Sequence, residues 1–324
     1  MGIAILGVLI GHWFALSGYP ADNIILRVLY FVPQLVFTQG FLLLSGFGLF
    51  YSFSRNGEVV AFYQKRFTRL IIPFAIMIFP FLIFYTIVGD INGWQFIGRL
   101  TSVSYWFDGN YYGMWYIALS VALYLLYPVL HKIMMYKDSF GVVTTGSLLM
   151  MLLFVGATRS VQNLAPEYYQ EHIHTFNGAF MFVVGMYVAY LSKQQKFRQQ
   201  LGVVILLLLF GISFLLKRQE TSYEFFYDGL KKTVFFIPAI CIFFSLLDRY
   251  KFVMWMRLIL EWFGRYTLEL YVLHLLLFCF LGNVHLGLNW SPVICISVAE
   301  VAILLLCNPI NKGINIITSK ITKS

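Results

Sequence analysis

A histidine stands in the middle of the first apolar segment, where proton-exchanging side chains are rare. This residue, His12, lies in the stretch MGIAILGVLIGHWFALSG. An imidazole, with a pKa of about 6.5, can take a proton from an alcohol or return one to a leaving group. Gly7 and Gly11 have the small-xxx-small spacing that lets helices approach closely. His12 is therefore a candidate catalytic base between helices, or a structural histidine hydrogen-bonded across them.

A basic cluster precedes a later apolar segment, in FYQKRFTRLIIPF. Of its cations Lys65, Arg66 and Arg69, the two arginines are three residues apart and would share one face of an α-helix. Guanidinium groups bind phosphate in a bidentate manner and stay charged. The cluster is a candidate site for a phosphorylated donor such as a coenzyme A thioester, although anchoring to anionic lipid headgroups explains it equally well.

Polar residues also form a stripe in FGRYTLELYVLHLLLF. Thr267, Tyr271 and His274 are spaced i, i+4, i+7, which places them on one helix face. Glu269 points elsewhere but is also expected inside the membrane. Because polar groups in lipid are costly, the stripe should face the interior of a helix bundle. It would either line a substrate cavity or bond neighbouring helices.

Three weaker signals accompany these motifs. Ser45 lies in FLLLSGFGLF and Trp115 opens another apolar segment; we count both, with Glu269, Tyr271 and His274, as candidates for the wall of a cavity. Close helix packing and the aromatic belt of the membrane interface are the alternative explanations. Glu300, in the last apolar segment, is a lone carboxylate whose partner the sequence does not identify.

The composition determines which elements must carry these residues. The chain has 324 residues, of which 60% are hydrophobic and only 11% charged, and its mean hydropathy is +0.78. Soluble domains carry about 25% charged residues, so lipid must solvate much of this protein. The apolar runs are continuous, whereas barrel strands alternate apolar and polar residues. We therefore predict an all-α membrane protein.

The apolar runs predict a polytopic protein with about ten transmembrane helices in a single domain over residues 1–324. A spanning helix needs about 20 apolar residues. Residues 91–107 are expected to lie along the membrane interface as an amphipathic piece. The ten predicted spans are near 2–19, 29–53, 70–88, 113–135, 140–157, 176–192, 200–216, 233–248, 264–284 and 291–310.

The positive charges predict the orientation. Of the 23 Lys and Arg residues, 16 fall in the loops after even-numbered spans and in the C-terminal tail. The positive-inside rule places that side, and both termini, in the cytoplasm. The net charge of +9 is explained by cytoplasmic loops and anionic lipid rather than by nucleic acid. We expect a multi-pass protein of the inner (cytoplasmic) membrane.

Five segments, in order along the chain, resemble the acyltransferase 3 family of bacterial integral membrane acyltransferases. They are GIAILGVLIGH, FLLLSGFGLF, KRFTRLIIPF, MWYIALSVALYLLYPVL and GRYTLELYVLH. In that family an arginine precedes the histidine of the first helix by eleven positions, where this chain has Met1. We therefore expect the first helix to be truncated at its N-terminus, or the activity to be damaged.

The resemblance implies an O-acetyltransferase. It would move an acyl group, usually acetyl, from cytosolic acyl-CoA to a hydroxyl of a carbohydrate or cell-surface glycan. The resemblance supports His12 as the catalytic residue and Lys65, Arg66 and Arg69 as the donor-binding residues. Acyl-CoA would be a co-substrate, with no bound cofactor and no metal. Membrane lipids and the glycan acceptor are the other expected partners.

Two other functions are compatible with the same residues. Prolines inside predicted spans, such as Pro80 and Pro238, are typical of transporters with broken helices. A transporter or flippase for an acyl group or a lipid-linked sugar would use them without bond chemistry, although the sequence has no internal repeat. Met1 in place of the arginine also fits an inactive sensor or assembly partner.

Overall fold

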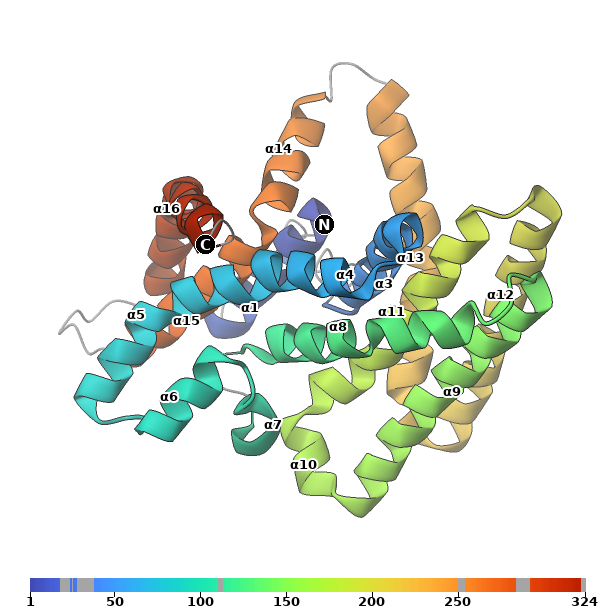
Figure 1. The fold of residues 1–324 in the computed structure, drawn as a ribbon, viewed down its shortest axis with the longest axis horizontal. Helices are drawn as coiled ribbons and strands as arrows, with labels where there is room; N and C mark the ends of the chain where they lie inside the picture. Colours follow the sequence, from blue (N-terminus) through green and yellow to red (C-terminus); the bar gives the residue numbers. More distant parts are fainter. Residues whose placement is uncertain are drawn as a thin grey trace. The chain divides into compact units, whose positions relative to one another are not determined.

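All regular structure among the described residues is helical in the computed structural model of the protein (Figure 1). The structure describes residues 1–17, 24, 26–27, 38–109, 113–249, 254–283 and 292–321. The helices are α1 (Gly2–Ser17), α3 (Thr38–Asn56), α4 (Val59–Arg66), the π turn η1 (Phe67–Ile71), α5 (Ile72–Val88), α6 (Gly93–Leu100), α7 (Tyr105–Asp108), α8 (Trp115–Met134), α9 (Phe140–Leu164), α10 (Pro166–Glu171), α11 (Ile173–Ser192), α12 (Lys196–Gln219), the 3-10 turn η2 (Thr221–Tyr223), α13 (Glu224–Arg249), α14 (Met254–Arg265), α15 (Thr267–Asn283) and α16 (Pro292–Ile321).

Several of these helices can cross a membrane, so the protein is an all-α membrane protein. Six in the described part of the chain are long and apolar enough, and Gly2–Phe14 and Thr267–Cys279 are shorter apolar helices. Each of the ten predicted segments overlaps a helix. Residues 18–19, 29–37, 284 and 291 of the predicted segments lie outside the described residues. The number of ten spans and the cytoplasmic position of both termini stay predictions.

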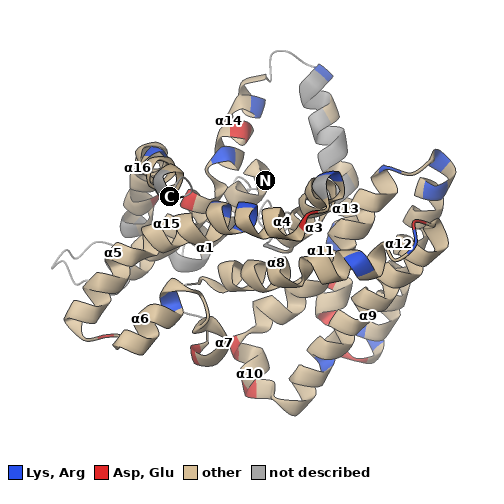
Figure 2. Cartoon of the chain, in the orientation of Figure 1, with Lys and Arg blue, Asp and Glu red and all other residues tan. Residues whose placement is uncertain are grey.

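Charged side chains avoid the middle of the apolar helices. Figure 2 shows Lys, Arg, Asp and Glu mostly near helix ends and in the connections, with long uncharged stretches between them. This distribution is expected when lipid surrounds the middle of a helix, because an unpaired charge there is costly.

The chain divides into two compact units. The first contains residues 1–37, 63–118 and 255–324, and the second contains residues 38–62 and 119–254. Within the first unit, α1, α15 and α16 pack against one another, and α5 packs against α15 and α16. The single domain expected over residues 1–324 stays a prediction.

In the second unit, α11 is the central helix and packs against α3, α9, α12 and α13. Its contact with α3 is a backbone-to-backbone crossing. A Cβ atom added to Gly46 would lie 2.0 Å from the Phe182 carbonyl oxygen, and one added to Gly185 would lie 1.9 Å from that of Leu43. Glycine at both positions lets the two helices approach this closely.

A π turn interrupts the long helix that carries the basic cluster. Residues 59–88 form one continuous helical span, and Phe67–Ile71 within it is a π turn. The Thr68 hydroxyl donates to the carbonyls of Gln64 and Lys65 just before it. A π turn holds more residues per turn than an α-helix. The directions of Arg66 and Arg69 therefore diverge more than the predicted α-helical spacing implies.

The predicted interfacial piece, residues 91–107, contains the two short helices α6 and α7. The Asn92 side chain accepts from the Gln95 amide at 2.9 Å, and the Gln95 side chain accepts from the Asn92 amide at 3.1 Å, which forms a capping box. The rings of Trp94 and Phe107 are exposed. Exposed aromatic side chains on short amphipathic helices fit the expected position along the interface, which stays a prediction.

The glycine crossing in the second unit predicts a stability effect. Replacing Gly46 by alanine should lower the free energy of unfolding by about 1–3 kcal/mol, because the new methyl group meets backbone that cannot move aside. The thermal unfolding midpoint in detergent measures the effect. Gly48→Ala, on the same helix with no atom within 4 Å of the added Cβ, is the control. Equal midpoints for the two variants would contradict the close crossing.

Candidate functional site

The structure places the two intramembrane histidines of the sequence prediction in direct contact. Nδ1 of His12, on α1, lies 2.7 Å from Nε2 of His274, on α15. Their ring centroids are 5.0 Å apart although these nitrogens are only 2.7 Å apart, so the rings meet edge to edge. His274 is fully buried and His12 is half-buried. Residues 262 positions apart in the sequence thus form one hydrogen-bonded pair.

The contacts of His274 determine which nitrogens carry protons in a neutral pair. Nδ1 of His274 lies 2.7 Å from the carbonyl oxygen of Leu270, one turn earlier on α15. A carbonyl can only accept, so this Nδ1 is protonated and donates. Nε2 of His274 therefore accepts from Nδ1 of His12. In this arrangement the lone pair of the His12 ring is on Nε2, as a general base or a nucleophile requires.

Aromatic residues hold the α15 side of the pair. The Tyr271 hydroxyl donates to the Gly113 carbonyl at 2.8 Å, and its ring packs edge to face on Tyr116 with centroids 5.4 Å apart. The rings of Tyr271 and His274 are 5.8 Å apart. Tyr271, predicted as a cavity wall, is thus a buried support between the start of α8 and the imidazole of His274.

A residue that the sequence reasoning did not single out supports the α1 side. The indole Nε1 of Trp13 donates to the Ser297 hydroxyl of α16 at 3.1 Å. This bond fixes α1 beside α16 next to His12, because Trp13 follows the histidine directly. The sequence does place a serine within the last apolar segment. Residue spacing along one helix, however, does not identify a hydrogen-bond partner on another helix.

Glu269 forms a contact between helices, and none of its described contacts reaches either histidine. Its carboxylate accepts a hydrogen bond from the Asn311 side chain of α16. The Asn311 side-chain oxygen in turn accepts from Asn315 at 2.9 Å, and Tyr266 donates to Asn308 at 3.2 Å. The sequence predicted Glu269 as a candidate cavity wall. The structure shows it buried in a polar contact between α15 and α16.

The basic cluster belongs to the same compact unit as the histidines. Lys65 and Arg69 are exposed and Arg66 is half-buried. The helix that continues from them, α5, packs against α15 and α16. The cluster therefore lies at the start of a helix that contacts the histidine-bearing helices, with two of its side chains accessible to an anion.

Two other candidates have different positions. Trp115 is buried at the start of α8, packed edge to face on Tyr116, and so lies beside the aromatic support of His274. Ser45 is buried in α3 and belongs to the second unit, not to the unit that carries the histidine pair. Among the described residues, no three His, Cys, Asp or Glu side chains gather as they would around a metal ion.

A family model described as an acyltransferase domain, that of the acyltransferase 3 family, matches residues 2–308 of the 324. The match includes both histidines, the basic cluster, Glu269 and Ser297. No curated protein and no solved structure matches the chain.

The Tyr271 bond gives a prediction for the site. Replacing Tyr271 by phenylalanine removes the donor to the Gly113 carbonyl and should lower the free energy of unfolding by about 1–3 kcal/mol, because a buried acceptor loses its partner. The thermal unfolding midpoint in detergent is the measurement. Tyr136→Phe removes a hydroxyl from a ring that is 85% exposed and should leave the midpoint unchanged. A loss no larger than that of the control would refute the supporting role.

Proposed function

We propose that this chain, which belongs to the acyltransferase 3 family, transfers an acyl group, in the first instance acetyl, from cytosolic acyl-CoA to a hydroxyl of a carbohydrate or cell-surface glycan in the inner membrane. Membership in the family makes the protein a membrane acyltransferase. The hydrogen-bonded chain Leu270–His274–His12 is the observation that supports hydroxyl chemistry. It gives an intramembrane imidazole a defined basic nitrogen.

In the proposed reaction, Nε2 of His12 takes the proton of the acceptor hydroxyl. The hydroxyl oxygen attacks the thioester carbonyl, a carbon–oxygen bond forms, and the carbon–sulfur bond breaks. The leaving coenzyme A thiolate receives the proton that His12 holds. The same nitrogen could instead carry the acyl group as an acyl-imidazole, and a labelled acyl adduct on His12 would identify that route.

His274 acts as a positioning residue in this scheme. It accepts from Nδ1 of His12 and so fixes the tautomer and the direction of the reactive ring, the task that a carboxylate performs in serine hydrolases. A neutral imidazole performs it without a negative charge. His274 therefore orients His12 but gives an imidazolium less stabilisation than an aspartate would.

The basic cluster is the proposed site for the donor. Arg66 and Arg69 would bind the phosphates of coenzyme A, with Lys65 beside them, because guanidinium groups bind phosphate oxygens in pairs. The exposure of Lys65 and Arg69 supports this assignment. The predicted orientation, which puts the cluster in the cytoplasm where acyl-CoA is found, agrees with it.

Substitutions in the pair test the catalytic assignment. His12→Ala should lower kcat for acyl transfer about 10²–10⁴-fold, the usual contribution of a general base, while the protein still reaches the membrane. His274→Gln, which keeps an acceptor, should retain more kcat than His274→Leu, which does not. Transfer of labelled acetyl from acetyl-CoA to total membrane glycan is the measurement. Full activity of His12→Ala would remove His12 from the reaction.

Substitutions in the basic cluster test donor binding. Arg66→Ala and Arg69→Ala should each raise KM for acetyl-CoA about tenfold and leave kcat nearly unchanged. The lost charge-assisted contact contributes to donor binding and not to the chemical step. Lysine at either position should restore part of the affinity. Lys137→Ala, which removes an exposed cation from the connection between α8 and α9, is the control. KM values equal to that of the control would assign the cluster to lipid headgroups instead.

A further inference from the structure

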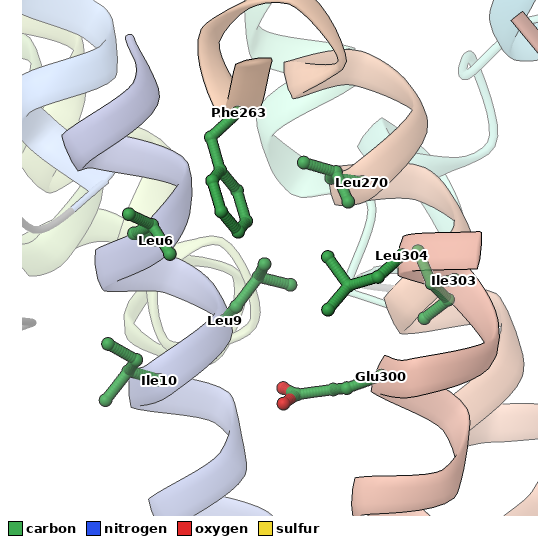
Figure 3. A pocket seen from close by; sticks show the side chains of 8 residues that line it. All are labelled: Leu6, Leu9, Ile10, Phe263, Leu270, Glu300, Ile303 and Leu304. Atoms are coloured by element: carbon green, nitrogen blue, oxygen red, sulfur yellow. The ribbon is translucent and has the colours of Figure 1, made fainter. Parts of the chain in front are cut away.

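An apolar cavity of about 130 Å³ lies within the first unit and is lined in part by the two helices that carry the histidine pair. Figure 3 shows its walls, which come from α1, from the end of α14, and from α15 and α16. With one exception the lining side chains are hydrocarbon, among them Leu6, Leu9, Phe263, Ile303 and Leu304. Such walls can bind a hydrocarbon chain but offer no hydrogen bonds to a free sugar.

The cavity shares its helices with the proposed catalytic pair. Leu9 lies three residues before His12 on α1. Leu270 lines the cavity with its side chain, while its carbonyl holds Nδ1 of His274. Leu9 and Leu270 thus bring the lining to within about one helical turn of the two histidines along α1 and α15.

The exception in the lining is a carboxylate. Glu300, on α16, reaches across the space toward α1 (Figure 3). Its Oε1 atom is buried and has no hydrogen-bond partner in the part of the chain that the structure describes. It also lies inside a candidate membrane span, residues 296–319. An acceptor kept in such a place without a donor is costly, and intramembrane carboxylates typically mark a substrate path.

We propose that this cavity binds the acceptor of the reaction as an amphiphilic alcohol that arrives from the bilayer, such as a glycan carried on a lipid. The hydrocarbon chain packs against the leucine and isoleucine side chains, and Glu300 accepts a hydrogen bond from a hydroxyl of the head group. This inference rests on the proposed function. The acyl chain of the donor fits the walls as well, but it has no hydrogen to donate to Glu300.

Photolabelling of the full chain in proteoliposomes tests the site. The two probes are a diazirine-bearing hexadecanol and the same diazirine-bearing chain without the hydroxyl. The alcohol should label peptides that contain Leu9 or Leu304 about tenfold more strongly than the alkane does, the effect of one hydrogen bond to a carboxylate. Glu300→Leu should reduce labelling by the alcohol to the level of the alkane. Glu261→Leu, which removes an exposed carboxylate paired with Arg257, should change nothing.

A second variant covers the case in which Glu300→Leu does not fold. Leu304→Trp fills the cavity, keeps Glu300, and should abolish labelling of these peptides by both probes. The control is Leu305→Trp, at a neighbouring position that is 73% exposed. Equal labelling of the wild type by the two probes, or unchanged labelling of either variant, would overturn the proposal.

A parallel assay of acetyl-CoA consumption separates this inference from the proposed function. Labelling that depends on the hydroxyl, with no acetyl transfer to any acceptor, would leave the alcohol site standing and refute the acetyltransferase assignment. Acetyl transfer without hydroxyl-dependent labelling would do the reverse. Transfer to octyl glucoside with a KM at least about tenfold below that for methyl glucoside would support both.

Discussion

A backbone carbonyl determines which ring nitrogens of the buried histidine pair carry a proton. The Leu270 oxygen has two lone pairs, so it can accept from the His274 imidazole in addition to the helix amide. Because it cannot donate, it fixes the tautomer of His274 and, through it, that of His12. In water, solvent could supply or remove these protons, but a membrane interior requires that the protein specify them. In the proposed mechanism, the basic nitrogen of His12 therefore depends on the main chain of α15.

Three arrangements of titratable side chains among the described residues of the first unit bear on the proposed site. The histidines satisfy each other, and Glu269 is held by an amide from α16. Glu300 faces an apolar space without a described donor. In the first two arrangements, a hydrogen bond within the protein offsets the free-energy cost of burying the polar group. Glu300 has no such partner among the described residues, and in our proposal a bound molecule supplies the hydrogen bond. Glu269 already accepts a hydrogen bond and therefore does not indicate a ligand.

The sequence predicts the fold class and the polar residues within the apolar helices better than the partners of those residues. Continuous apolar runs predicted helices, and the polarity of His12, Tyr271 and His274 within such runs identified them. Periodicity along a single helix reports which face is polar, but it does not specify the facing residue on a helix 262 positions away. For the same reason the Trp13–Ser297 bond and the cavity around Glu300 were not predicted. The π turn was missed because hydrophobic patterning assumes a constant 3.6 residues per turn.

The π turn sets the direction in which the cations before it point relative to α5. The turn adds one residue to the helical path between Lys65 and the membrane-embedded part of α5. If the same residues formed a regular α-helix, the cations before the turn would be rotated by about 100° relative to α5, which is the rotation of one residue. All charges would remain while the direction of Lys65 and Arg66 changed. The direction of these two cations thus depends on the backbone conformation of one turn, separately from the side chains that carry the charge.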